Sequence, residues 1–304
     1  MAKDNKKNTA NNNEQTEPKT ENIRTEPAAE EVKSAPDSGK VLLRIVLIAA
    51  LAVAVTIAGL WFSGLRYKKT TNGDGTSIKF FGWVDDEGEL NRGTLYFSGE
   101  EVGTAKLDRE GKLTYSDGTV YVGDLSGGFR NGQGKLTYTD GSVYEGQFLN
   151  NEITGNGTFV YSSGDIYQGE FNDGEYNGFG TYKYADGRIY EGYYTDNMRN
   201  GQGKMTYADG SWYDGSYVND AKSGQGTYHF ANGDEYVGAF ENDVRTGQGT
   251  YTFANGETYT GSFVDGTLNG WGKYTWPSGR VLEGMFENGE YVRTTEVDPG
   301  EGDE

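Results

Sequence analysis

Apolar and polar side chains alternate with a period of two through most of residues 111–291, and this alternation predicts β-strands. In residues 121–143, Tyr121, Gly123 and Leu125 share one parity, whereas Val122 and Asp124 take the other. One apolar and one polar face is typical of a half-exposed antiparallel sheet. We therefore expect two strands in each such segment and a continuous meander of β-hairpins.

The alternating pattern recurs every 23 residues without insertion or deletion. Each repeat opens with an apolar residue followed two positions later by glycine, and it closes with a Gly-x-Gly pair. The opening residues are Tyr121, Tyr144, Tyr167, Tyr190, Tyr213, Tyr236, Tyr259 and Leu282. Self-similarity at one fixed period indicates a repeat array. We expect seven full 23-residue repeats and a partial eighth within residues 121–291.

Glycines at fixed positions predict how a repeat packs and turns. Gly123 and Gly134 leave a slot on the apolar face, in which Tyr121 and Tyr138 can lie over bare backbone. Asp-Gly or Asn-Gly pairs lie between most repeats, and they favour the positive φ that tight hairpin turns need. Inside each repeat the sequence predicts a longer connection of six residues, 126–131 in the first copy.

Residues 40–62 follow a different pattern, because Val41 to Phe62 are apolar except for Arg44. At ~1.5 Å per residue, a helix of this length spans about 33 Å, enough to cross a hydrocarbon core of roughly 30 Å. This segment predicts a single transmembrane helix, which makes a membrane one partner of the chain. Basic residues are nearly balanced on its two sides, and we favour a signal-anchor orientation that places the repeats outside the cytoplasm.

The remaining segments flank these two features. Residues 1–39 are polar and punctuated by proline, which predicts a disordered tail. Residues 63–79 are expected to be a linker, residues 80–120 degenerate repeats that cap the array, and residues 292–304 an acidic disordered tail. The fold class predicted is an all-β repeat, an extended antiparallel hairpin meander, with one transmembrane α-helix and disordered tails.

The composition of the chain further limits what the sheet can bind. The chain has 23 tyrosines, so a core must be built from rings packed over glycine. Residues 111–291 hold 11 Lys and Arg against 24 Asp and Glu, a net charge of −13. The negative electrostatic field of these residues excludes nucleic acid and disfavours anionic lipid as partners of the array. The chain has no cysteine, which removes disulfides and thiolate metal sites, and we expect no cofactor and no metal.

The repeat itself has the form Tyr-x-Gly-x-Phe, a six-residue gap, Gly-x-Gly, an aromatic residue and Asp-Gly or Asn-Gly. It resembles the MORN repeat (membrane occupation and recognition nexus), closely over residues 121–286 and loosely over residues 80–120. The resemblance implies an array of β-hairpins that serves as a scaffold, a dimerisation surface or a membrane-apposed module. Some arrays of the family accompany lipid kinases or methyltransferases, and phosphoinositide binding has been proposed for the family. Neither enzyme domain has room here, and the acidic array lacks the basic patch that lipid headgroups need.

Four aromatic residues break the polar face and are the candidate binding residues. Trp212 stands where other copies have Val, Ile, Glu or Thr, and Tyr193 stands among polar or small residues. Phe179 and Trp271 replace the glutamine usual between the paired glycines. Exposed rings can stack on sugars or on a partner protein. The only histidine, His229, occupies a position that is threonine in other copies, so we expect no catalytic triad.

These observations predict a membrane-anchored, non-catalytic scaffold that presents a long β-sheet surface to a partner protein. An alternative is a cell-envelope carbohydrate-binding module that holds an envelope glycan, and a third, less favoured function is lipid binding. An enzyme would need a carboxylate pair in a concave pocket, which a single-layer ribbon does not imply.

Overall fold

The computed structural model describes residues 38–73, 75–98 and 103–292. The expected tails, residues 1–39 and 292–304, lie almost wholly outside them. The described residues form one α-helix and 21 strands, and their bounds are as follows: α1 Ser38–Phe62, β1 Leu65–Thr71, β2 Ser77–Val84, β3 Leu90–Ser98, β4 Gly103–Leu107, β5 Lys112–Tyr115, β6 Val120–Ser126, β7 Phe129–Thr137, β8 Val143–Leu149, β9 Glu152–Val160, β10 Ile166–Asn172, β11 Glu175–Lys183, β12 Ile189–Thr195, β13 Met198–Thr206, β14 Trp212–Val218, β15 Ala221–His229, β16 Glu235–Glu241, β17 Val244–Thr252, β18 Thr258–Val264, β19 Thr267–Thr275, β20 Val281–Glu287 and β21 Glu290–Val292.

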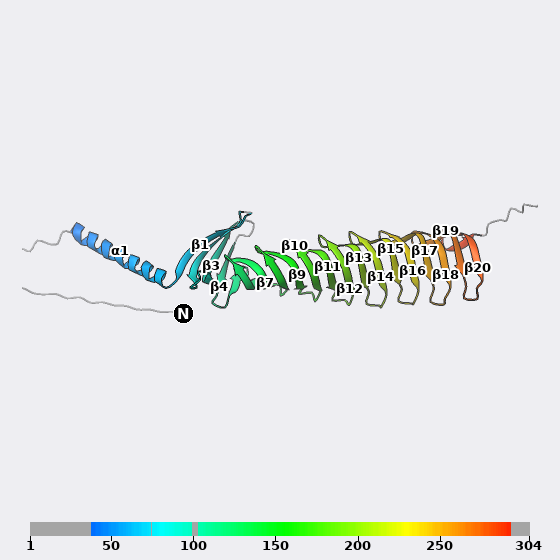
Figure 1. The fold of residues 1–304 in the computed structure, drawn as a ribbon, viewed down its shortest axis with the longest axis horizontal. Coiled ribbons are helices and arrows are strands. Elements are labelled where there is room, and N and C mark those ends of the chain that lie inside the picture. Colours follow the sequence, from blue (N-terminus) through cyan, green and yellow to red (C-terminus); the bar gives the residue numbers. More distant parts are fainter. Residues whose placement is uncertain (1–37, 74, 99–102, 293–304) are drawn as a thin grey trace, which may run out of the picture. The chain divides into compact units, whose positions relative to one another are not determined.

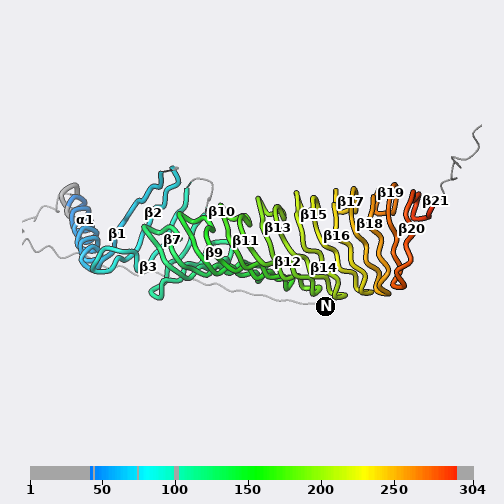
Figure 2. Tube along the Cα trace, turned by 45° about the vertical axis from the view of Figure 1, so that its right-hand side comes forward, coloured from blue at the N-terminus to red at the C-terminus, as the bar shows by residue number. Residues whose placement is uncertain are grey.

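The strands form a single 21-stranded sheet in which, across the described residues, each strand pairs antiparallel with the next along the chain. Figures 1 and 2 show the hairpins following one another in sequence order from β6 to β20. This confirms the all-β repeat meander. The chain divides into two compact units after Thr56, within α1. Residues 45–62 of α1 have a mean hydropathy of 2.6, and none of this stretch is buried inside the structure.

The first strand corrects the expected linker at residues 63–79. Leu65 pairs with Trp83 and Tyr67 with Phe81, so β1 extends the sheet by one strand beyond the degenerate repeats. The alternation Leu65, Tyr67, Lys69 has the period of a strand, but its basic residues and the Gly-rich segment after it hid the pattern.

The turns also differ from the sequence prediction, since the tight turn lies inside the repeat. In the first copy Ser126 pairs with Phe129, which leaves a two-residue turn at Gly127 and Gly128 with φ of 59° and 96°. Later copies place Asn or Asp in the same left-handed conformation, for example Asn219 and Asp220. Two positive φ values are the mark of a type I′ hairpin turn. The expected six-residue connection is therefore wrong.

The turn between repeats is the longer one. Residues 138–142 connect β7 to β8, closed by a hydrogen bond from Tyr138 N to Ser142 O of 2.9 Å and one from Gly141 N to Tyr138 O of 3.1 Å. Gly141 has a φ of 90°, as the Asp-Gly pattern predicts. Both long edges of the sheet are thus rows of turns that recur once per repeat.

Candidate interaction surfaces

The sheet face that carries the repeat tyrosines, called the inner face below, contains the core. Tyr121, Tyr144, Tyr167, Tyr190, Tyr213, Tyr236 and Tyr259 are all fully buried. In each of these repeats the hydroxyl donates a hydrogen bond to a backbone oxygen three residues on, as from Tyr190 to Tyr193 O at 3.1 Å. The ring crosses the two paired glycines, so a Cβ added at Gly203 would lie 2.2 Å from the Tyr190 hydroxyl. These tyrosines hold the sheet together and offer nothing to a partner.

A second set of rings on the inner face is only half-buried. They lie 15 and 17 residues after each repeat tyrosine, beside the turns between repeats, and we call them the aromatic ladder. Its members are Tyr138, Phe159, Tyr161, Tyr182, Tyr184, Tyr207, Tyr228, Phe230, Tyr251, Phe253, Tyr274 and Trp276. Tyr138 therefore belongs to this row, whereas Tyr121 alone was found over the glycine pair of its repeat.

Neighbouring ladder rings contact one another within and between repeats. The centroid separations are 4.5 Å for Tyr228 and Phe230, 5.6 Å for Phe230 and Tyr251, and 4.7 Å for Tyr251 and Phe253. Met205 occupies a ladder position and is buried, so the rings form two runs, before and after it. Each run is a continuous apolar strip that remains partly open to solvent.

Carboxylates fix several ladder hydroxyls. The Tyr251 hydroxyl donates to Asp234 at 2.6 Å, and the Tyr274 hydroxyl donates to Glu257 at 2.6 Å. Burial, followed by the hydrogen bond to Asp234, raises the pKa of Tyr251 to about 12. The hydrogen bond from Tyr274 lowers the pKa of Glu257. The ladder is therefore edged by ionised carboxylates.

A row of cations lies beside the ladder on the inner face, nine residues after the repeat tyrosines: Arg130, Arg199, Lys222 and Arg245. Arg199 donates from Nε to a carboxylate oxygen of Asp220 at 2.9 Å and from Nη2 to the backbone oxygen of Asp220 at 2.7 Å. The Arg245 guanidinium lies 5.2 Å over the Tyr251 ring and donates to Gly266 O at 2.7 Å. Each arginine thus connects its own repeat to the turn of the next.

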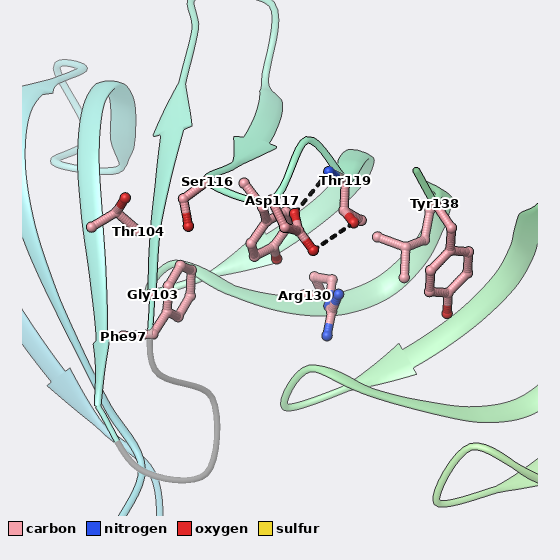
Figure 3. A pocket seen from close by; sticks show the side chains of 10 residues that line it. Phe97, Gly103, Thr104, Ser116, Asp117, Thr119, Arg130 and Tyr138 are labelled. Atoms are coloured by element: carbon pink, nitrogen blue, oxygen red, sulfur yellow. Dashed lines mark hydrogen bonds between the residues drawn. The ribbon is translucent and has the colours of Figure 1, made fainter. Parts of the chain in front are cut away.

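Between the cations and the ladder the inner face is hollowed. One concavity of about 270 Å³ is lined by Lys222, Tyr228, Phe230, Phe240, Asp243, Val244, Arg245 and Gly266. A second, of about 500 Å³, lies at the N-terminal end of the ladder, where Arg130, Tyr138 and Phe97 surround Asp117 and Thr119 (Figure 3). Phe97 stacks on Tyr115 there at 5.6 Å, which continues the ring row toward β3.

The opposite sheet face, called the outer face below, holds the four aromatic residues predicted from the sequence. Phe179 and Tyr193 come together edge to face at 5.5 Å, and both are exposed. Trp212 stacks on His229 at 5.5 Å and lies under the Lys204 ammonium at 4.8 Å. Trp271 is exposed and pairs in register with Met285. The four rings therefore form three separate groups on β11–β12, β13–β15 and β19–β20.

The inner-face ladder was missed as a candidate site, although its signal was visible. An aromatic residue recurs 15 or 17 residues after each repeat tyrosine, but its parity is that of the core, which predicts burial for these rings. The cation row was hidden because its positions fell inside the expected six-residue loop. Within the part of the chain that the structure describes, no cluster of His, Asp and Glu could hold a metal ion.

The MORN repeat family model matches seven consecutive segments, residues 121–143, 144–166, 167–187, 190–212, 213–235, 236–258 and 259–279, which together exceed half of the chain. Among solved structures, the chain is similar to the SAS-4 (dCPAP) TCP domain of Drosophila melanogaster, solved in complex with a proline-rich motif of Ana2 (dSTIL), with 17% identity, a TM-score of 0.35, and coverage of 58% of this chain and 88% of that one. It is also similar to the E1021V mutant of the TCP10 domain of Danio rerio CPAP, with 12% identity, a TM-score of 0.34, and coverage of 72% and 99%. No curated protein matches the chain.

Proposed function

The chain belongs to the MORN repeat family, and we propose that it is a non-catalytic scaffold, anchored in a membrane by α1, whose inner face binds an extended segment of a partner protein. The apolar stretch of residues 45–62 supports the anchor. We place the repeats on the extracytoplasmic side. Protease treatment of intact cells tests this orientation, because cleavage of the array from outside requires it to be exposed there.

The observation that carries the binding proposal is the aromatic ladder. Large half-exposed rings in a continuous strip are typical of surfaces that bind other macromolecules rather than of a solvated sheet. Neighbouring strands lie ~4.8 Å apart, so the two strands of one repeat give a repeat spacing of about 9.6 Å along the ladder. A polyproline II segment advances about 9.3 Å in three residues. Such a segment, lying across the strands, can therefore present one side chain to each successive repeat.

The charges in the turns along the two long edges of the sheet further limit which partner segments can bind. Carboxylates line the turns within repeats at Asp173, Asp196, Asp220, Asp243 and Asp265. They also line the turns between repeats at Asp140, Asp165, Asp186, Asp209, Asp234 and Glu257. Arg199 and Lys222 of the cation row pair with Asp220 and Asp243, but the eleven carboxylates of the two turn rows outnumber the four cations of that row. A segment between the turn rows therefore faces net negative charge, which favours lysine and arginine in the partner and speeds its encounter with the sheet. The proposed partner segment is basic and proline-rich.

Peptide selection on the full chain in lipid nanodiscs tests the proposal. A library of random 15-residue peptides is selected for binding, and the enriched peptides are titrated against a ladder variant, Tyr184→Ser, Tyr207→Ser and Phe230→Ser. We expect proline with Lys or Arg at three-residue spacing, and a loss of affinity of about tenfold or more on the variant, since aromatic contacts of this kind contribute ~1 kcal/mol each. Enriched peptides that bind both proteins equally well would refute the inner-face site.

The matched control is an outer-face variant, Phe179→Ala with Tyr193→Ala, which removes the same class of side chain from the opposite face. It should retain full peptide affinity. The exposed Phe179 and Tyr193 pair is the specific observation in favour of the second candidate, an envelope glycan stacked on the outer face. Retention on cell-wall polysaccharide that is lost when Phe179, Tyr193, Trp212 and Trp271 become alanine, with an unchanged melting transition, would favour that candidate.

A further inference from the structure

The outer face of the first five strands differs chemically from the rest of the sheet. Register places Leu65, Tyr67, Phe81, Trp83 and Tyr96 on this face, opposite the buried core residues of the same strands. Tyr67, Phe81 and Tyr96 are 61%, 56% and 49% exposed, although each is large and mostly apolar. We call these five residues, with the cations described next, the proximal patch.

The charged side chains on the same strand positions are all basic. They are Lys69, Lys79, Arg92, Lys106 and Lys112, and the described outward positions of β1–β5 include no carboxylate. From β6 onward the outer face carries carboxylates such as Asp124, Glu145 and Glu191. An otherwise acidic protein thus concentrates positive charge and exposed rings on one short section of its sheet.

One pairing within the proximal patch points to an anion. Lys69 lies directly opposite Lys79 in the β1–β2 register, and both are exposed. Like charges directly opposite each other destabilise a sheet. A bound anionic group would neutralise the pair, and exposed rings beside it would suit the boundary between headgroups and acyl chains, where Tyr and Trp gather.

The chain itself brings the proximal patch near a bilayer. β1 begins three residues after Phe62, the last residue of α1, so its first Cα lies within about 11 Å of the helix end. The polar headgroup layer on one side of a bilayer is about 5 to 7 Å deep beyond the hydrocarbon core. If α1 spans the membrane as proposed above, β1 therefore begins within the headgroup layer or a few ångströms beyond it.

We infer that the proximal patch docks on the anionic headgroups of the bilayer that holds α1. The lysines and Arg92 contact lipid phosphates, and Tyr67, Phe81 and Tyr96 enter the interfacial layer. Docking would fix the angle at which the repeats leave the membrane. The inference rests on the proposed anchor, but it is independent of the partner site on the inner face.

A fluorescence experiment on the full chain tests the inference, and the absence of cysteine allows single labelling sites. Tyr96→Cys carries an environment-sensitive dye, and Thr260→Cys on the outer face of β18 is the reference site. The protein is reconstituted in vesicles of phosphatidylcholine alone or mixed with phosphatidylglycerol, each with headgroup-linked nitroxide quenchers. We expect strong quenching at residue 96 only in anionic vesicles, reversed by salt, and none at residue 260.

Two triple variants separate the patch from general electrostatics. Lys69→Gln, Lys79→Gln and Lys106→Gln should remove most of the quenching at residue 96. Lys135→Gln, Lys204→Gln and Lys273→Gln make the same charge change on the outer face of the array and should leave it intact. Equal quenching in neutral and anionic vesicles, equal effects of the two variants, or equal quenching at both sites would overturn the inference.

Flotation of the same samples distinguishes the patch from the anchor. A chain that fails to float with phosphatidylcholine vesicles contradicts the proposed anchor. If that chain still floats with anionic vesicles, and the Lys69, Lys79 and Lys106 substitutions abolish this flotation, the proximal patch binds anionic lipid without the anchor. A chain that floats with both but shows no quenching at residue 96 retains the anchor and overturns the patch.

Discussion

The glycine pairs allow a sharp test of how the core is built, and Gly192 and Gly203 are the chosen pair. They lie opposite each other on β12 and β13, under the ring of Tyr190. A Cβ at Gly203 would meet three Tyr190 atoms, at 2.2, 2.5 and 2.7 Å. A Cβ at Gly192 would also meet the Tyr190 hydroxyl, at 2.5 Å, but its other two contacts are with backbone, 2.5 Å from Gly203 Cα and 2.7 Å from Gln202 O. Removing the Tyr190 ring should therefore relieve the three contacts at Gly203 but leave the backbone contacts at Gly192.

The cost of Gly203→Ala follows from the immobility of Tyr190. Its ring is fully buried and packs edge to face on Tyr194 at 5.2 Å and on Tyr217 at 5.3 Å, so it cannot move aside. Overpacking a filled site costs about 1 to 3 kcal/mol, and we expect the upper end, about 3 kcal/mol. The same change in a Tyr190→Leu background should cost much less, because the clashing atoms are gone. Gly192→Ala should remain costly in both backgrounds.

Hydrogen exchange measured by mass spectrometry is the assay, because a repeat array need not unfold in one step. In Gly203→Ala, peptides from β12 and β13 should lose protection by roughly a hundredfold, which corresponds to about 3 kcal/mol. Peptides from β17 to β19 report whether the effect stays local. If Tyr190→Leu rescues both alanine variants equally, or rescues neither, the assignment of the two clashes is wrong.

Two further predictions concern the cation row and the tyrosines. Arg199→Met should lower the free energy of unfolding by about 1.5 to 3 kcal/mol and loosen β13 to β15, because it removes charge-assisted hydrogen bonds to the next turn. The ion pair between Arg188 and Asp186 lies within one exposed turn, so Arg188→Met should lower that free energy by less than about 0.5 kcal/mol in the same exchange experiment. Burial raises the pKa of Tyr121, Tyr144 and Tyr213 to about 12 from an ordinary value of 10.0. The unfolded chain thus loses these protons first, so stability should hold up to pH 10 and fall between pH 10 and 12, seen as loss of the β-sheet circular dichroism together with tyrosinate absorbance. Full tyrosinate absorbance of all 23 tyrosines by pH 12 without loss of the sheet would contradict this.

Most of the fold could be predicted from the sequence because one pattern recurs at a fixed spacing. Tyr190 and its glycines recur at one spacing because the ring fits only over bare backbone, and that steric demand allows little variation. β1 was missed because a strand at the sheet edge needs only one paired side, so its Lys-rich alternation resembles a linker. The within-repeat turns were not predicted as tight turns because Asn219 and Asp220 adopt the left-handed conformation that is more typical of glycine, and glycine is concentrated in the turns between repeats.

The candidate sites were less predictable because they depend on which side chains register brings together. Phe179 and Tyr193 lie 14 residues apart in the sequence, and only the β11–β12 register makes them a pair. Likewise, Lys69 and Lys79 become a like-charge pair only once β1 joins the sheet. Parity alone assigns a residue to a face, but it does not tell whether a ring on that face is covered.

The arrangement of the sheet explains how one repeated core can support different surfaces. Among the described residues each strand pairs only with its neighbours in sequence, so a substitution on an exposed position changes one hairpin and leaves distant hairpins unaffected. The repeat tyrosines and glycines are fixed by packing, whereas the outward positions differ from copy to copy. The proximal patch at β1–β5 and the aromatic ladder of later repeats can therefore coexist in one sheet, because neither requires a change in the core that supports the other.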